Sequence, residues 1–209
     1  MKSRKFIVIA ASLMCLLPML VGFIMFNELP AKIPSHFDFN GVADAYMDKT
    51  LLIVGLPLFF AVITLITGFL VNEDPKKQNQ AKILYILSLI FLPILSNITV
   101  NLSYLIALGY ELNISNIILL LLGIMFILIG NYLPKVKQNY TMGVQLPWTL
   151  NDEDNWNKTH RLTGFLWVIG GFIFFIVPFF PVLLFINLGL LLVVPIIYSY
   201  TIYKKKLRG

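Results

Sequence analysis

The sequence predicts an all-α, polytopic membrane protein with six transmembrane helices. Of the 209 residues 58% are hydrophobic and only 12% are charged, whereas a soluble domain carries about 25% charged residues. A bilayer span needs about 20 mainly apolar residues, and six apolar segments of that order can be drawn. We expect one six-span membrane domain over residues 1–209, with a small extracytoplasmic hairpin-like loop and a cytoplasmic loop that contains a short helix.

The apolar runs place the spans. The first four are expected at Phe6–Phe26, Leu51–Val71, Ile83–Ala107 and Ile117–Leu133. The first follows a basic start and offers no small-residue cleavage site, so an uncleaved anchor is expected rather than a signal peptide. From Leu162 to Tyr203 no residue is formally charged, and roughly 40 helical residues would reach about 60 Å, twice the hydrocarbon core. This run must fold back, and Pro178–Pro181 is the natural turn between spans five and six because proline ends helices.

The basic residues predict the orientation. With the N-terminus in the cytoplasm, all but Lys32 and Lys49 of the 16 lysines and arginines fall on the cytoplasmic side. Cytoplasmic loops of membrane proteins carry an excess of Lys and Arg. We therefore expect a multi-pass membrane protein with both termini in the cytoplasm.

Residues 27–50, here called the hairpin segment, form the first extracytoplasmic loop. Asn40-Gly41 between short alternating runs is a strong hairpin signal, since both residues tolerate positive φ. Four acids, including Asp38 and Asp44, outnumber two lysines, and such a surface suits a cationic or amphipathic ligand. A solvated connector explains the same composition, and both interpretations stay open. His36 has no second histidine on its side of the membrane, which argues against a metal site.

Residues 134–161, here called the polar segment, form the cytoplasmic loop between spans four and five. Thr149 followed by Asp152 resembles a capping box, and the three consecutive acids that start at Asp152 suit the first turn of a helix. Trp156, His160 and Thr163 share one face of that helix by their spacing. Interfacial anchoring explains the tryptophans of this segment, but not its whole set of polar residues.

Two amides lie within the third span. Asn97 and Asn101 are four residues apart and share one helix face, which we expect to point into the helix bundle. Hydrogen bonding between helices is the favoured interpretation, and a polar spot in a path or cavity is the other. No Asp, Glu, Lys, Arg or His lies in the middle of any expected span, which argues against a proton-coupled pump.

Residues of both segments form recognisable motifs. Those of the cytoplasmic motif are Gly130, Asn131, Pro134, Lys135, Asn139, Gly143, Pro147, Trp148, Thr149, Leu150, Trp156, Thr159, His160, Arg161 and Gly164. Those of the extracytoplasmic motif are Leu29, Pro30, Ile33, Pro34, His36, Phe37, Gly41, Asp44 and Lys49. Together they resemble the SdpI family of bacterial membrane proteins. Gln145 departs from the pattern, where a basic residue is expected.

The resemblance implies an immunity protein that gives resistance to a secreted toxic peptide, and a receptor that holds a helix-turn-helix repressor at the membrane. A membrane enzyme ranks last, because the sequence contains no H-E-x-x-H, G-x-S-x-G or phosphate-cradling motif, and no cofactor is expected. The net charge of +6 is assigned to topology rather than to direct nucleic-acid binding. The expected ligand-binding residues are Pro30, Pro34, His36, Asp38, Gly41, Asp44 and Lys49. The expected partner-coupling residues are Asn131, Pro134, Lys135, Asn139, Gly143, Pro147, Trp148, Thr149, Trp156, Thr159, His160 and Arg161. A small-solute or peptide transporter is the alternative, supported by six spans and the amides of span three.

Overall fold

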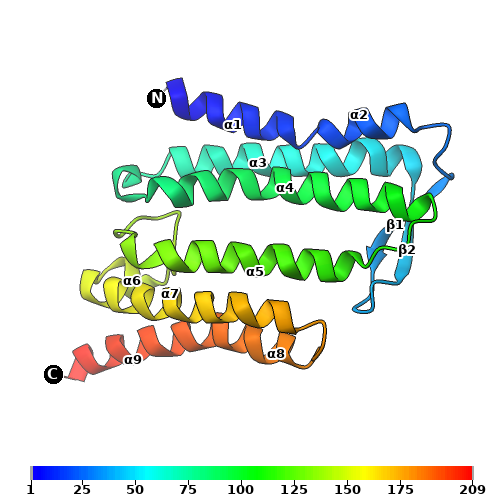
Figure 1. Ribbon diagram of the computed structural model, residues 1–209. Coiled ribbons are helices and arrows are strands. Elements are labelled where there is room, and N and C mark those ends of the chain that lie inside the picture. The colour runs from blue at the N-terminus through cyan, green and yellow to red at the C-terminus, as the bar shows by residue number, and fades with distance from the viewer. Residues whose placement is uncertain (1, 209) are drawn as a thin grey trace. The chain divides into compact units, whose positions relative to one another are not determined.

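The long helices follow one another in the order expected from the apolar runs. The computed structural model describes residues 2–208 (Figure 1). Its α-helices are α1 (Lys2–Met14), α2 (Leu17–Ile24), α3 (Leu56–Asn72), α4 (Lys82–Ala107), α5 (Ile114–Tyr132), α6 (Pro147–Leu150), α7 (Glu153–Ile176), α8 (Leu183–Leu188) and α9 (Val194–Arg208). Its strands are β1 (Lys32–Phe37) and β2 (Ala43–Asp48). One-turn helical pieces at Leu51–Gly55, Lys77–Asn79, Leu133–Lys135 and Gly189–Val193 extend or join the longer helices.

Six helical stretches among the described residues are long and apolar enough to cross a membrane. They are Arg4–Ile24, Leu51–Asn72, Lys82–Ala107, Ile114–Lys135, Glu153–Ile176 and Leu183–Arg208. This confirms the predicted all-α, polytopic fold. The turn expected at Pro178–Pro181 separates the last two stretches.

The chain forms two compact units. The first contains the described residues up to Phe69 together with Ser88–Ile118, and the second contains Leu70–Leu87 and the described residues from Leu119 onward. The first unit therefore holds the hairpin segment, and the second unit holds the polar segment.

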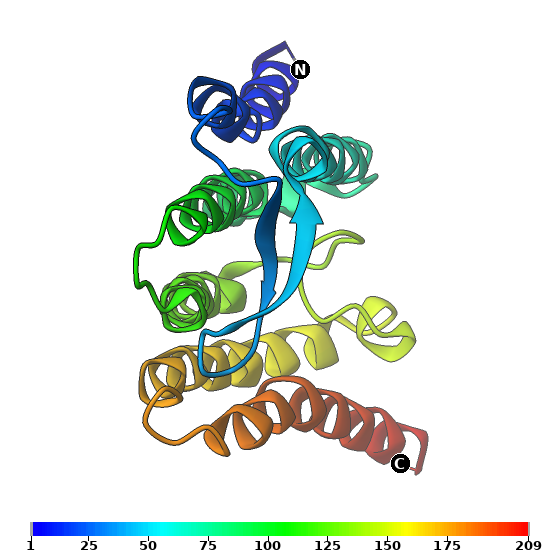
Figure 2. The same cartoon turned by 90° about the vertical axis from the view of Figure 1, so that its right-hand side faces the viewer.

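The hairpin segment forms a two-stranded antiparallel sheet (Figure 2). Lys32 pairs with Asp48 at one end and Phe37 with Ala43 at the other, with irregularities on either side of His36. The connection is longer than the two-residue turn typical of Asn-Gly, because Asp38–Val42 lies between the strands and only Gly41 has a positive φ, 81°. The predicted hairpin is confirmed, but its strands are joined by the longer connection Asp38–Val42 rather than by a two-residue Asn-Gly turn.

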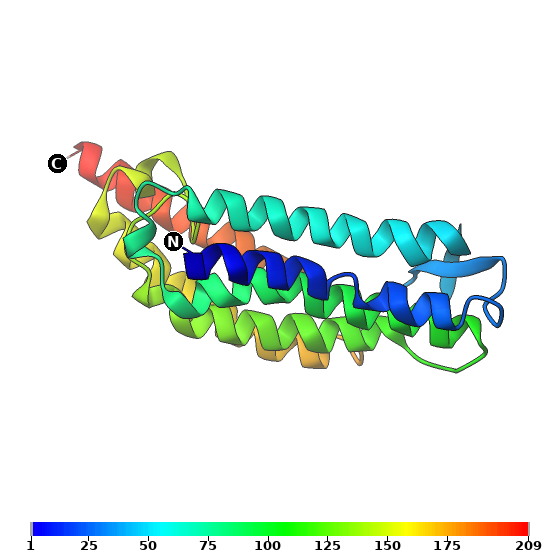
Figure 3. The same cartoon turned by 90° about the horizontal axis from the view of Figure 1, so that it is seen from above.

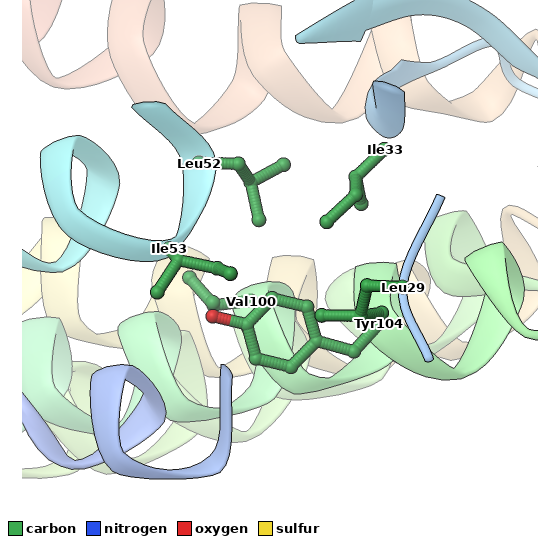
Figure 4. Packing of buried hydrophobic residues seen from close by; sticks show 6 residues of the cluster. All are labelled: Leu29, Ile33, Leu52, Ile53, Val100 and Tyr104. Atoms are coloured by element: carbon green, nitrogen blue, oxygen red, sulfur yellow. The ribbon is translucent and has the colours of Figure 1, made fainter. Parts of the chain in front are cut away.

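A small apolar core attaches the hairpin to its helices. Leu29 and Ile33 are buried against Leu52 and Ile53, which precede α3, and against Val100 and Tyr104 of α4 (Figure 4). These six side chains are each at most 3% exposed. The sheet is therefore held on the helices of the first unit rather than hanging from them as a free loop.

The first span is broken between α1 and α2 (Figure 3). Pro18 has no N–H, so the carbonyl of Met14 loses the partner that an intact helix would give it. Asn97 of α4 donates its Nδ2 to that carbonyl at 2.9 Å, and the Ser96 hydroxyl donates to the carbonyl of Cys15, also at 2.9 Å. The polar side chains of the third span thus satisfy the backbone of the first.

Glycines bring α5 and α7 of the second unit into backbone contact. A Cβ at Gly130 would lie 2.8 Å from the carbonyl oxygen of Gly164, and a Cβ at Gly171 would lie 2.7 Å from that of Gly123. Small residues permit such close approach of transmembrane helices. Gly123 of α5 lies beside Gly171 of α7, and the later Gly130 of α5 lies beside the earlier Gly164 of α7. The helices α5 and α7 therefore run antiparallel.

Candidate functional site

The hairpin segment uses much of its polar chemistry to hold its own shape. One oxygen of Asp38 accepts the N–H groups of Asn40 and Val42 at 2.9 and 2.8 Å. The bond from Val42 is the main reason that the pKa of Asp38 lies below its ordinary value. Lys49 donates to the carbonyls of Phe26 and Leu29 at 2.9 and 3.3 Å. Asp38 and Lys49 are therefore shape-determining residues.

The remaining predicted ligand residues of this segment differ in exposure. His36 and Asp44 are exposed and hydrogen-bond to each other at 2.6 Å. Pro30 is exposed, but Pro34 is buried, so a ligand would not reach Pro34 directly. Gly41 lies against Asn113, whose Nδ2 donates to the carbonyl of Asn40 at 3.0 Å and attaches the turn to the start of α5.

Three exposed apolar side chains of the segment were not among the predicted site residues. Phe39, Val42 and Tyr46 are 67%, 62% and 58% exposed. The alternation of aromatic residues around the turn was the sequence signal for this apolar surface, but the prediction was based on the acidic residues. The hairpin thus presents an apolar and acidic surface.

The polar segment is built around Trp156 and His160 of α7. Trp156 is fully buried, its indole N–H donates to the carbonyl of Val136 at 2.8 Å, and its ring stacks on His160 with centroids 3.9 Å apart. His160 Nε2 accepts the N–H of Val144 at 3.0 Å, and Nδ1 lies 2.8 Å from the Trp156 carbonyl. These bonds require a neutral ring with its proton on Nδ1. Gly143, at φ 112°, permits this packing because a Cβ there would collide with the His160 ring.

Other motif residues shape the chain that wraps around this pair. Asn139 is fully buried and accepts the N–H groups of Thr141 and Met142 at 3.0 and 2.7 Å. Thr149 is also fully buried, and its hydroxyl donates to the carbonyl of Val144 at 2.7 Å. A turn with its polar atoms inside the protein needs such internal partners.

The predicted coupling residues differ in exposure. Five of the predicted coupling residues, Asn139, Thr149, Trp156, Thr159 and His160, are at most 1% exposed. A partner would not touch them, so they act by giving the segment its shape. The exposed members of the predicted set are Asn131, Pro134, Lys135, Gly143, Pro147 and Arg161, and Trp148 is half-buried.

The helix start in this segment also differs from the expectation. Thr149 belongs to the short helix α6, where its hydroxyl accepts the N–H of Leu146 at 2.9 Å. Asp152 is the N-cap of α7 and accepts the N–H groups of Asp154 and Asn155 at 3.0 and 3.2 Å. The capping box predicted from Thr149 and Asp152 is wrong, because α6 ends before Asp152 and a second helix begins there.

Two neighbouring elements clamp the polar segment, and neither contains a predicted site residue. In the loop after α3, Asp74 accepts the hydroxyl of Thr141 at 2.6 Å and the N–H of Tyr140 at 3.0 Å. Burial alone would raise the pKa of Asp74, but its hydrogen bonds, led by that from Thr141, hold the pKa below the ordinary value. The adjacent acids Glu73 and Asp74, beside Lys76 and Lys77, were the available signal.

The second clamp is α9. Trp148 donates its indole N–H to the Ser199 hydroxyl at 2.9 Å, and Asn155 donates to the Ser199 carbonyl at 3.0 Å. Asp152 pairs with Lys206 at 2.8 Å, and this lysine is the main cause of the lowered pKa of Asp152.

An open pocket lies beside Trp148. It has a volume of about 290 Å³ and is lined by Pro147, Trp148, Asn151, Asp152, Tyr203, Lys206 and Leu207. Most of its lining residues are exposed, whereas the motif residues around Trp156 and His160 are buried. Among the described residues, no group of three or more His, Cys, Asp or Glu could hold a metal ion.

The intramembrane amides have different roles. Asn97 of α4 donates a hydrogen bond to the carbonyl of Met14 in α1, which agrees with the favoured interpretation of hydrogen bonding between helices. Asn101 instead donates to the carbonyl of Asn97 within its own helix at 2.7 Å. Neither observation indicates a polar path.

Comparison with known proteins places both segments in matched regions. The SdpI/YfhL protein family matches residues 135–199, and a domain of unknown function, DUF1648, matches residues 13–70. The protein named Immunity protein SdpI from Bacillus subtilis (strain 168) is 35% identical over 206 residues, which cover 95% of this chain and 96% of that protein. No solved structure matches.

Proposed function

Since this chain belongs to the SdpI/YfhL family of membrane proteins, we propose that it is an immunity protein that gives a bacterial cell resistance to a secreted toxic peptide. The observation that carries the proposal is the 35% identity to Immunity protein SdpI over 95% of the chain, which spans both candidate segments. The proposal involves no catalytic step and no cofactor.

The proposed orientation places both termini in the cytoplasm. It is supported by the distribution of the 16 basic residues, of which only Lys32 and Lys49 fall outside. Cysteine labelling in a Cys15→Ser background tests it, because Asn40 and Asn151 are both exposed. An impermeant thiol reagent added to intact cells should modify Asn40→Cys and miss Asn151→Cys. Labelling of Asn151→Cys alone would reverse the orientation.

The hairpin segment is the proposed contact for the toxic peptide. Its exposed Phe39, Val42 and Tyr46 supply apolar area, and its exposed Asp44 supplies negative charge. A cationic, amphipathic peptide is complementary to this surface. Because Asp38 and Lys49 are occupied within the hairpin, we assign them to its shape rather than to ligand contact.

The pocket beside Trp148 is the proposed contact for a cytoplasmic partner, a helix-turn-helix repressor. The buried motif residues support it indirectly, since Trp156, His160 and Thr149 hold the chain that carries Trp148. Under this proposal Asn151→Trp, which fills the pocket rim from an exposed position, leaves protein abundance unchanged but lowers reporter output.

Survival of cells without their own immunity protein tests the main proposal. Cells that express this chain should survive the toxic peptide that acts on the relative's host. The pair Phe39→Ser and Tyr46→Ser should lose protection, whereas Tyr110→Ser, which removes an aromatic side chain 60% exposed outside the segment, should keep it. Full protection by the double variant at equal abundance would exclude the hairpin as the contact.

No described feature favours the transporter alternative. The amides that supported it are used by the backbone, Asn97 at Met14 and Asn101 at Asn97. Uptake of labelled solute into vesicles that contain the chain would revive that alternative.

A further inference from the structure

Arg161 is a motif residue that the folded polar segment does not use. It lies on α7 next to His160, yet its side chain is exposed, and among residues 2–208 it makes no hydrogen bond or ion pair. Lys158, one turn earlier, pairs with Asp154 at 2.9 Å and is therefore occupied. The guanidinium of Arg161 is therefore available to a group outside the described chain.

Arg161 lies at the end of an exposed apolar stripe. Phe165, Ile169, Phe172 and Ile176 follow it at spacings of three or four residues and are 64%, 37%, 55% and 45% exposed. Residues at these spacings share a helix face. In a transmembrane helix such a face contacts acyl chains, so Arg161 lies where the acyl region gives way to headgroups.

Lys135 lies just beyond α5, in the one-turn helical piece Leu133–Lys135. Leu120, Ile124 and Leu128 are 51%, 44% and 39% exposed and lead through exposed Asn131 to exposed Lys135 at spacings of three or four. The Lys135 ammonium lies 4.8 Å from the ring centroid of Tyr132 and makes no ion pair among the described residues. The exposed stripe of α7 therefore ends at Arg161, and that of α5 leads to Lys135 just beyond the helix.

The two stripes face the same side of the helix pair. On α5 the exposed Ile124 follows the contact glycine Gly123 by one residue, and on α7 the exposed Phe165 follows Gly164 by one residue. One residue turns a helix by about 100°, and in antiparallel helices this turn brings both side chains to the same side. Because Gly130 lies beside Gly164, Lys135 and Arg161 lie near the same end of this apolar surface.

We propose that this α5–α7 surface binds an anionic phospholipid, with Arg161 and Lys135 on its phosphate and the two apolar stripes along its acyl chains. Guanidinium groups match phosphate oxygens by paired hydrogen bonds, and an ammonium supplies a second positive charge. The occupant must carry both an anion and hydrocarbon chains, because the cations stand directly at the end of the exposed apolar face. The inference does not depend on resistance to a toxic peptide.

Lipid retention by the full chain tests the proposal. The protein purified in a neutral detergent is mixed with phosphatidylglycerol or phosphatidylcholine, and the bound lipid is measured by native mass spectrometry. The wild-type chain should retain phosphatidylglycerol in preference, and the double variant Arg161→Gln, Lys135→Gln should weaken that retention on the order of tenfold, as expected for the loss of two interfacial cations.

A matched variant separates a built site from general positive charge. Lys204→Gln, Lys205→Gln also removes two exposed lysines, but from the end of α9, and it should retain phosphatidylglycerol like the wild-type chain. Equal losses in both double variants, or no loss in either, would overturn the proposal. So would displacement of the lipid by inorganic phosphate, or a dimer that buries this surface and excludes lipid. Unchanged melting temperatures would show that all variants are folded.

Discussion

Replacement of Trp156 by Phe isolates one indole N–H in the core of the polar segment. That N–H donates to the carbonyl of Val136 at 2.8 Å, and both residues are at most 2% exposed. Leaving a buried carbonyl without its partner costs about 1–3 kcal/mol. The smaller ring also loses buried apolar area worth roughly 1 kcal/mol. We therefore expect Trp156→Phe to lower the free energy of unfolding by about 2–4 kcal/mol.

Trp148→Phe is the matched control, because it makes the same chemical change at a half-buried site. Its acceptor, the Ser199 hydroxyl, keeps its own bond to the carbonyl of Ile196 at 2.9 Å, so we expect a loss below about 1 kcal/mol. In a chain of this size each kcal/mol lowers the melting temperature by roughly 2–4 °C. Thermal unfolding in detergent should show a fall of roughly 5–15 °C for Trp156→Phe and a few degrees at most for Trp148→Phe. Equal shifts, or none for Trp156→Phe, would refute the assignment of Trp156 to the core.

Three further predictions concern other parts of the chain. Asn97→Leu should lower stability by about 0.6–1.7 kcal/mol, whereas Asn101→Leu, which breaks a bond only within its own helix, should cost less in the same melting assay. Gly41→Ala must hold an alanine at φ 81° and should cost about 1–2 kcal/mol, seen as faster proteolysis of the hairpin segment. The hydrogen bonds that Asp74 accepts, above all the one from the Thr141 hydroxyl, hold the pKa of Asp74 below its ordinary value. The ionised Asp74 therefore stabilises the fold above about pH 4, and this contribution is lost as the pH falls further. The destabilisation caused by Asp74→Asn at pH 7 should therefore shrink below that pH, and a constant difference would contradict this role.

The span pattern was predictable because length and hydropathy are local properties. The need for a turn followed from the length of the last apolar run, and its place followed from Pro178 and Pro181. The shared face of Trp156, His160 and Thr163 followed from helical spacing, and all three are buried.

The partners of these residues were not predictable, because they lie far away in the sequence. Trp156 bonds to Val136, 20 residues before it, and Trp148 bonds to Ser199, 51 residues after it. Tryptophan next to a span is as typical of the interface as of a core, so the distinction between Trp156 and Trp148 required the folded chain. The same holds for Asp74, whose role depends on Thr141 in another loop.

The break in the first span links the evolution of two distant positions. Pro18 leaves the Met14 carbonyl without its helical donor, and Asn97 supplies a replacement. In relatives whose first span lacks this proline, the carbonyl keeps its helical partner, and an amide at the position of Asn97 loses its benefit. Among homologous sequences we therefore expect the proline and the amide to be gained and lost together. This coupling would appear when the two positions of a sequence alignment are compared as a pair, and not when either position is considered alone.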